Sequence, residues 1–260
     1  MRVYHEPMAV QLETALPVPL HRLDLDAYHR MAAAGALEGV EVELLEGLLV
    51  DKHSQREDPI HRLHVETYNR MVAAGALEGQ RVELLEGLIV EMSPKSPDHI
   101  MVVTMLMRHF AAAPRWWMQV QDSIETASNS EPEPDLVLAA QKPPPGQHLR
   151  TALLVIEVAV SSHRVDRGVK AGMYARAGIP TYWLVDVPGR ALEVRTEPGV
   201  GGYDHCETYR EGATVPSPLE GVEDLDIAAL LADIEGSGNP ARRARSLRSD
   251  PPGPSERELT

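Results

Sequence analysis

A short apolar run that contains a single carboxylate constrains the fold of this chain more than any other feature. Residues 152–160 are almost wholly apolar and rich in β-branched side chains, which is typical of a strand buried on both faces. Glu157 lies inside this run, and a buried carboxylate is costly unless it is protonated, paired or bound to a cation. A second apolar run, residues 136–140, comes earlier and begins directly after Asp135. Asp135 is therefore the nearest acidic residue that could share a cation with Glu157.

The residues that follow predict an α/β arrangement. A helix is expected from about residue 165 to 177, because Gly178 stands at the position that favours a helix end and Pro180 follows it. Residues 181–187 then have the pattern of another buried strand. The order strand, strand, helix, strand predicts a central mixed β-sheet flanked by helices.

Two carboxylates and a lysine in this segment are the minimal set for metal-assisted phosphodiester hydrolysis. Asp135 and Glu157 offer the oxygen ligands that a hard cation such as Mg²⁺, or alternatively Mn²⁺, prefers. The cation would activate water and stabilise developing charge, and Lys170 would add a positive charge or orient the nucleophile. The alternative is that Lys170 forms only a surface ion pair with Asp166, four residues before it, worth a few tenths of a kcal/mol.

These motifs resemble the Uma2 family, also known as DUF820, of the PD-(D/E)XK nuclease superfamily. The resemblance covers roughly residues 61–210 and implies a restriction-endonuclease-like α/β fold. The residues that carry it are Glu83-Leu84-Leu85-Glu86-Gly87, Met92-Ser93-Pro94, His99, Pro134-Asp135, Glu157-Val158-Ala159, Asp166 with Lys170, and the run from Tyr174 to Asp186.

The resemblance also implies roles for individual residues. Asp135 and Glu157 would be the metal ligands, Lys170 the catalytic lysine displaced onto the following helix, and Glu83 an accessory acidic residue. The superfamily's pattern would place a lysine at position 159, where this chain has Ala159, and Lys170 is the expected substitute. Glu83 has a second interpretation, as the polar half of an alternating edge strand.

Several other residues have both a functional and a plain structural interpretation. His99 resembles a family position at the start of a helix expected over residues 97–112, where a capping or surface role is the alternative. Gln121, near a strand expected over 118–124, could help to order the site. Trp116 and Trp117 could stack on bases, but adjacent strand residues face opposite sides. Cys206 with His205 gives too few ligands for a metal site.

A duplication precedes the nuclease-like segment. Residues 21–50 repeat as residues 61–90, with 21 of 30 aligned positions identical. Each copy predicts a helix of about ten residues, a glycine-containing loop and a strand or hairpin, and Glu43 is the counterpart of Glu83. The sequence thus divides into a flexible lead-in (1–20), the extra copy with a charged linker (21–60), a nuclease-like domain (61–235) and a tail (236–260). The tail is expected to be disordered because it is poor in apolar residues. Its arginines (Arg242, Arg243, Arg245 and Arg248) either tether nucleic acid or simply keep the tail solvated.

Charge and composition bear on the function class. The formal net charge of −14 argues against tight non-specific DNA binding. The lone cysteine and the lack of a secretory signal or membrane-spanning run favour the cytoplasm. The leading hypothesis is a Mg²⁺-dependent endonuclease with DNA as substrate; a homodimer is compatible with cutting both strands. The alternatives are an inactive nuclease-fold binding or assembly module, and a metal-dependent hydrolase of another phosphoester.

Overall fold

A six-stranded mixed sheet forms the centre of the computed structural model, which describes residues 18–54 and 58–234. The strand order is β10-β9-β8-β7-β6-β5; β7 and β8 are parallel, and every other neighbouring pair is antiparallel. The mixed sheet predicted from the sequence is confirmed. The strands are β5 (Trp117–Val120), β6 (Leu136–Ala139), β7 (Leu154–Ala159), β8 (Thr181–Asp186), β9 (Ala191–Gly199) and β10 (Gly202–Arg210).

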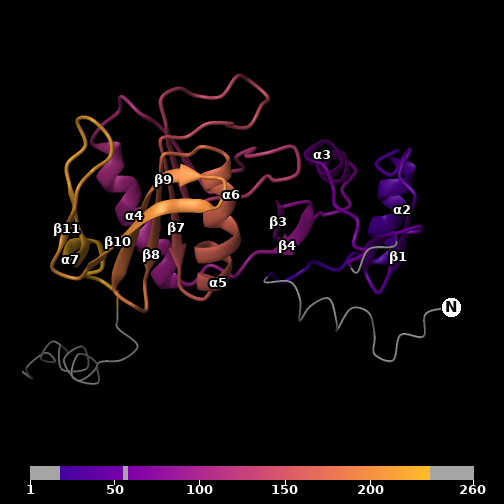
Figure 1. Ribbon diagram of the computed structural model, residues 1–260, viewed down its shortest axis with the longest axis horizontal. Coiled ribbons are helices and arrows are strands. Elements are labelled where there is room, and N and C mark those ends of the chain that lie inside the picture. Colours follow the sequence, from indigo (N-terminus) through magenta and orange to yellow (C-terminus); the bar gives the residue numbers. More distant parts are fainter. Residues whose placement is uncertain (1–17, 55–57, 235–260) are drawn as a thin grey trace, which may run out of the picture.

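Helices cover both faces of this sheet, as Figure 1 shows for α4 and α6. Alternation along β7 sends Ile156 and Val158 toward α4 (Pro97–Ala111), in a core that also includes α7 (Ile227–Leu230). Val155 and Ala159 lie in the opposite core, against α6 (Ala171–Arg176). A short helix α5 (His163–Val165) and one π-helical turn η1 (Asp166–Lys170) lead into α6. Glu157 has the same parity as Val155, so its side chain belongs to the α6 face of the sheet.

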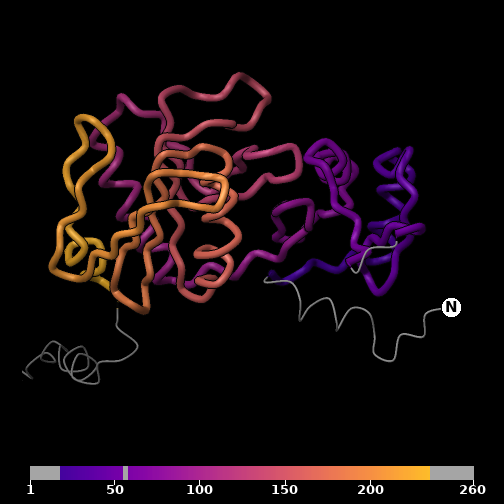
Figure 2. Tube along the Cα trace, viewed as in Figure 1, coloured from indigo at the N-terminus to yellow at the C-terminus, as the bar shows by residue number. Residues whose placement is uncertain are grey.

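The duplicated segments form two small units with the same secondary structure. The first unit (residues 21–50) contains α2 (Leu25–Ala33), β1 (Val42–Leu45) and the start of β2 (Leu48–Asp51). The second unit (residues 61–90) contains α3 (Val65–Ala73), β3 (Val82–Leu85) and the start of β4 (Leu88–Glu91). The second unit lies between the main sheet and the first unit, which forms one end of the molecule (Figures 1 and 2).

The two units pack as a reciprocal pair. Leu20, just before the first unit, bridges Val90 of the second, and Ile60, just before the second, bridges Val50 of the first. Met31 and its counterpart Met71 are both fully buried in one shared core. The end of the predicted lead-in is therefore part of the fold, while residues 1–17 and the predicted tail 236–260 lie outside the described residues.

One predicted strand is shorter in the structure. The strand expected over 118–124 ends at Val120, because Gln121 has a φ of 50° and turns the chain away. Near the end of the described chain, strand β12 (Leu225–Asp226) pairs with β11 (Thr214–Val215) and leads directly into α7. Asp226 causes the change of structure, since its side chain accepts from the first N–H groups of α7. No helix in the described ranges is long and apolar enough to cross a bilayer.

Gly87 in the β3–β4 turn is a position where stability depends on the absence of a side chain. Its φ is +81°, and an added Cβ would lie 2.8 Å from the Cβ of Arg62. We expect Gly87→Ala to lower the free energy of unfolding by about 2–4 kcal/mol, because backbone strain adds to a steric clash. Gly79→Ala is the matched control, with a φ of +76° and no atom within 4 Å; strain alone predicts about 1 kcal/mol. Urea denaturation measures both, and equal losses would contradict the clash.

Candidate active site

Asp135 and Glu157 meet at the junction of two central strands. The antiparallel register pairs Leu136 with Ile156, and its extension by one residue sets Asp135 opposite Glu157. Both carboxylates are buried. They come together because a loop of the chain returns β7 beside β6, so residues far apart in sequence become neighbours on one sheet.

Lys170 connects these carboxylates to the second unit. Its Nζ lies 3.1 Å from Oε1 of Glu157 and 3.0 Å from Oε2 of Glu83, and all three side chains are buried. Glu83 comes from β3 and also accepts the Glu133 N–H at 3.1 Å. Glu83 therefore points into the site, and its interpretation as the solvated half of an edge strand is wrong. The proposed surface ion pair between Lys170 and Asp166 is wrong too, because Asp166 is also buried.

The π-helical turn η1 brings Asp166 and Lys170 onto one buried face. Such turns occur mostly as local insertions in helices and frequently at functional sites. The Ser162 hydroxyl donates to the Asp166 carboxylate, and the Tyr182 hydroxyl donates to the Asp166 carbonyl at 3.1 Å. These bonds fix the turn, so that the lysine reaches β7 from the helix rather than from position 159 on the strand. Ala159 itself is buried in the core.

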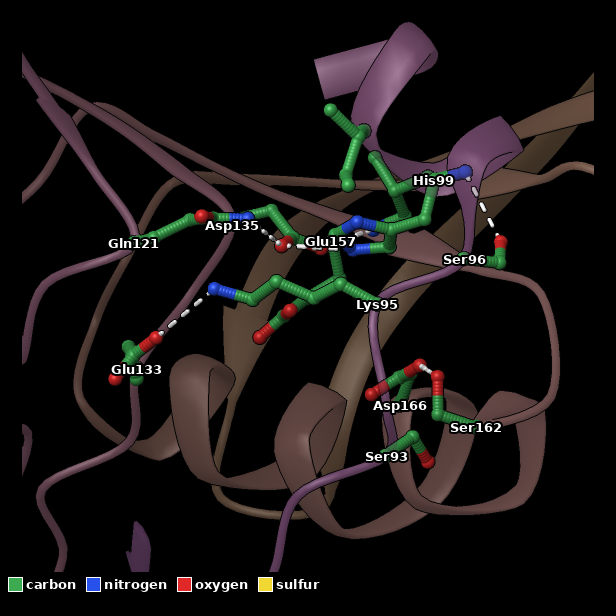
Figure 3. A network of polar contacts seen from close by, with 12 residues as sticks. Ser93, Lys95, Ser96, His99, Gln121, Glu133, Asp135, Glu157, Ser162 and Asp166 are labelled. Carbon is green, nitrogen blue, oxygen red and sulfur yellow. Dashed lines mark hydrogen bonds and ion pairs between the residues drawn. The ribbon is translucent and has the colours of Figure 1, made fainter. Parts of the chain in front are cut away.

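Three donors fix the Asp135 carboxylate (Figure 3). His99 Nε2 lies 2.9 Å from Oδ1, and Gln121 Nε2 donates to the same oxygen at 3.2 Å. The Val158 N–H donates to Oδ2 at 2.8 Å. His99 is buried at the start of α4, where Ser96 caps the helix. The alternative interpretation of His99 as a surface residue is therefore wrong, and Gln121 contacts the site as its position suggested.

The charges in this cluster are unequal, and the pKa values shift accordingly. Burial raises the pKa of the Glu157 carboxyl well above its usual range, although Lys170 acts against it. Burial also acts to lower the pKa of the Lys170 amine, but Glu157 and Glu83 outweigh it and hold that pKa well above its usual range. One ammonium thus faces more carboxylates than it can neutralise. Lys170 stays charged, and Glu157 is the group that tends to keep a proton.

Asp135 differs from Glu157 in this respect. Burial acts to raise its pKa, but the hydrogen bond and charge of His99 and the Val158 N–H together hold the pKa below its usual range. Asp135 is therefore ionised at neutral pH. One carboxylate ready to bind a cation lies beside one that must first lose a proton, and cation binding would favour that loss.

The cluster opens into a cleft of about 400 Å³. Glu83, Asp135, Glu157, Asp166 and Lys170 all line it, together with serines and the basic residues Arg81, Lys95 and Arg164. Lys95 lies 3.5 Å from Glu133, and Arg164 is exposed. An acidic floor beneath a partly basic rim is an arrangement that suits a cation and a phosphate together.

The donor set fits a hard divalent cation with few protein ligands. Asp135 and Glu157 supply only carboxylate oxygens, and Mg²⁺ is usually held by one or two carboxylates together with waters and substrate phosphate. No group of three or more His, Cys, Asp or Glu side chains is placed to hold a metal among the residues that the structure describes. Asp135 and Glu157 could therefore supply two ligands to such a cation, fewer than the four protein ligands of a closed structural zinc site.

The remaining sequence candidates lie away from the cleft. Trp116 packs against the α4 core and donates to the Glu220 carbonyl, while Trp117 is partly exposed. Cys206 is exposed on β10, and Glu43 is exposed on β1. The arginine cluster of the tail lies outside the described residues.

Tyr174 is a site residue whose role the sequence did not settle. Its hydroxyl donates to Oε1 of Glu157 at 2.8 Å, and the ring is fully buried. A tyrosine four residues after Lys170 on a helix facing the strand is the signal that could have found it, since such residues share one helix face.

We expect Tyr174→Phe to lower the free energy of unfolding by about 1–2 kcal/mol, because Glu157 loses a buried hydrogen bond. Tyr182→Phe is the matched control: it removes an equally buried hydroxyl that bonds to the Asp166 carbonyl and not to Glu157. Only Tyr174→Phe should change Mn²⁺ affinity, measured by calorimetry. An equal change in both variants would contradict a specific role for Tyr174.

Comparisons with known proteins give one family match and a similar solved structure. The model of the Uma2 family, described as "Putative restriction endonuclease", matches residues 65–229, which is more than half of the chain. The chain also resembles the crystal structure of a "putative nuclease belonging to DUF820" from Anabaena variabilis ATCC 29413, with a TM-score of 0.48 and 16% sequence identity. That similarity covers 58% of this chain and 89% of the other. No curated protein matches the sequence.

Proposed function

This chain belongs to the Uma2 family, and on that premise we propose that it is a Mg²⁺-dependent endonuclease that hydrolyses DNA phosphodiester bonds. The observation that carries the proposal is the convergence of Asp135, Glu157 and Lys170 at the floor of one cleft, with Glu83 beside the lysine. The expected ligands are Asp135 and Glu157, and Mn²⁺ is the natural substitute in experiments.

Each residue of the cluster has a distinct role in this proposal. A bound divalent cation would supply Lewis acidity toward the scissile phosphate and its attacking water. Lys170 holds Glu157 in place and offers a fixed positive charge where negative charge develops in the transition state. Glu83 orients the Lys170 amine, and Asp135 is kept ionised and oriented by His99 and Val158.

The rim of the cleft supports a polyanionic substrate despite the acidic chain. Arg81, Lys95 and Arg164 line the same cleft as the carboxylates, so local attraction for phosphates can coexist with a net charge of −14. Because the favourable charges are few, DNA affinity should fall as salt rises with only a shallow slope.

A second candidate is a nuclease-fold module that binds without cutting. Two observations favour it. The position at which the PD-(D/E)XK superfamily's pattern would place a lysine is occupied by the buried Ala159, and the net charge of the chain is strongly negative. In that case the cleft would bind cations or phosphates without turnover.

Cleavage of supercoiled plasmid in Mg²⁺ or Mn²⁺ separates the two candidates. The endonuclease predicts nicking by the wild type that chelation abolishes and that both Asp135→Ala and Glu157→Ala lose. A trace contaminant would nick equally with all three proteins. The binding module predicts cation binding without nicking across plasmids, linear duplexes and single strands.

A further inference from the structure

The second unit binds the nuclease-like core through a short extended segment, residues 128–131. This segment runs along the edge of β3 and the start of α3. Three backbone hydrogen bonds hold it: Val65 N–H to the Ser128 carbonyl at 2.8 Å, Gly87 N–H to the Asn129 carbonyl at 2.6 Å, and Glu131 N–H to the Leu84 carbonyl at 2.8 Å. The interaction is strand addition, in which backbone groups supply the binding and side chains the specificity.

Side chains complete this interface in the second unit. Val65 is 7% exposed and Leu85 1% exposed; Val65 packs in the core shared by the two units, and Leu85 in the core that also contains Ile124 and Met173. The carboxylate of Glu131 is held by Asn69, whose Nδ2 donates to Oε2 at 3.1 Å. The segment is thus recognised by its extended backbone, by small polar residues and by one carboxylate.

The first unit presents the same surface without an occupant among the described residues. Leu25 and Leu45, the counterparts of Val65 and Leu85, are 60% and 38% exposed. Within the described ranges β1 pairs only with β2, so the edge that carries Leu44 has no neighbouring strand. Likewise, Leu25 N–H and Gly47 N–H have no backbone acceptor in that part of the chain. His29 stands where Asn69 stands and can donate to a carboxylate.

The backbone of the first unit has the same conformation at this surface as the backbone that binds residues 128–131 in the second unit. Gly47 has a φ of 80° and Gly87 of 81°, and the residues before them match as closely. The same hydrogen bond anchors each turn, from Leu23 N–H to the Gly47 carbonyl and from Leu63 N–H to the Gly87 carbonyl, both at 2.8 Å. The surface is therefore preformed, which lowers the cost of binding.

We propose that the first unit is a docking site for an extended peptide segment of another protein. The segment adds as a strand to the edge of β1 that has no partner among the described residues, covers Leu25 and Leu45, and sets a carboxylate beside His29. Its chemistry is that of residues 128–131: small polar residues followed by an acidic one. The occupant comes from another molecule because residues 128–131, the segment of this chemistry among the described residues, are already held by the second unit. The family match begins at residue 65, so this site is an addition to the nuclease-like part.

The test uses the full chain and a fluorescent peptide of residues 124–133 as the probe, with binding followed by anisotropy. We expect saturable binding to the wild type. Leu45→Lys and Leu25→Glu should each weaken it about 10-fold or more, because each removes an apolar contact. Both positions are exposed, so the variants should fold normally. A peptide with Glu131→Lys should also bind more weakly. Val200→Lys, at an exposed valine in the β9–β10 turn, is the control and should bind as the wild type does.

Three results would overturn the proposal. The first is no binding by the wild type at about 1 mM peptide. The second is binding that Leu45→Lys and Leu25→Glu leave unchanged. The third is self-association of the wild type, seen by sedimentation and lost in Leu45→Lys, without peptide binding; this would assign the surface to a second copy of the chain.

Discussion

Lys170→Met is expected to lower the free energy of unfolding by about 3–5 kcal/mol at neutral pH, because it leaves buried carboxylates without their counter-ion. The Nζ of Lys170 lies within 3.1 Å of carboxylate oxygens of both Glu83 and Glu157, and all three side chains are buried. Protonation of the carboxyl groups can relieve the repulsion, so the loss should shrink at acidic pH. Chemical denaturation at several pH values measures it.

Lys95→Met is the matched control for this prediction. Lys95 lines the same cleft, but its ion pair with Glu133 is longer, at 3.5 Å, and partly exposed. Exposed pairs contribute less than about 1 kcal/mol. A loss for Lys170→Met no larger than that for Lys95→Met would show that the buried cluster does not depend on the lysine.

Glu157→Gln is expected to separate stability from activity. The variant keeps the shape and the hydrogen bonds of the side chain but removes the charge that a cation needs. Cleavage should fall roughly 1000-fold, because a bound metal ion lowers the activation barrier by several kcal/mol. Each factor of ten in rate corresponds to about 1.4 kcal/mol. Glu131→Gln is the control, since Glu131 is equally buried but lies outside the cleft, and its cleavage rate should be unchanged.

The stability of Glu157→Gln should differ from that of the wild type in a pH-dependent way. Burial raises the folded-state pKa of Glu157 above its unfolded value, so the native state holds this proton more tightly than the unfolded state. Its contribution to stability is fully present below the unfolded pKa, near 4.5, and is lost as pH rises through the folded pKa. The glutamine variant has no such loss. Without metal, the stability of the variant should therefore increase relative to that of the wild type as pH rises. A difference in unfolding free energy that does not change with pH would contradict the raised pKa.

Much of the fold could be predicted because local patterns and tertiary structure agree. The apolar runs of β6, β7 and β8 and the glycine after α6 mark buried strands and a helix end without further information. The ends of β5 and α7 were less predictable. They depend on the left-handed conformation of Gln121 and on the pairing of Leu225, and single-residue backbone choices and distant pairings leave little trace in sequence.

The candidate site was predictable in its members and less so in its connections. Glu157 stood out because a carboxylate interrupts an otherwise apolar strand. The link from Lys170 to Glu83 joins residues 87 positions apart and depends on the second unit's hairpin packing against α6, which no local pattern specifies. The role of His99 was left open for a similar reason: a histidine at a helix start has a sufficient local explanation as a capping or surface residue, and only the packing of α4 brings it to Asp135.

Calorimetric titration of the full chain with Mn²⁺ tests the central claim most directly, namely that Asp135 and Glu157 together hold a divalent cation. We predict one binding site in the wild type, lost or strongly weakened in both Asp135→Asn and Glu157→Gln and retained in Glu131→Gln. Mn²⁺ binding should also release protons, seen as a dependence of the heat on the ionisation enthalpy of the buffer. No binding to the wild type, with or without DNA, or binding that survives in both carboxylate variants, would contradict the account.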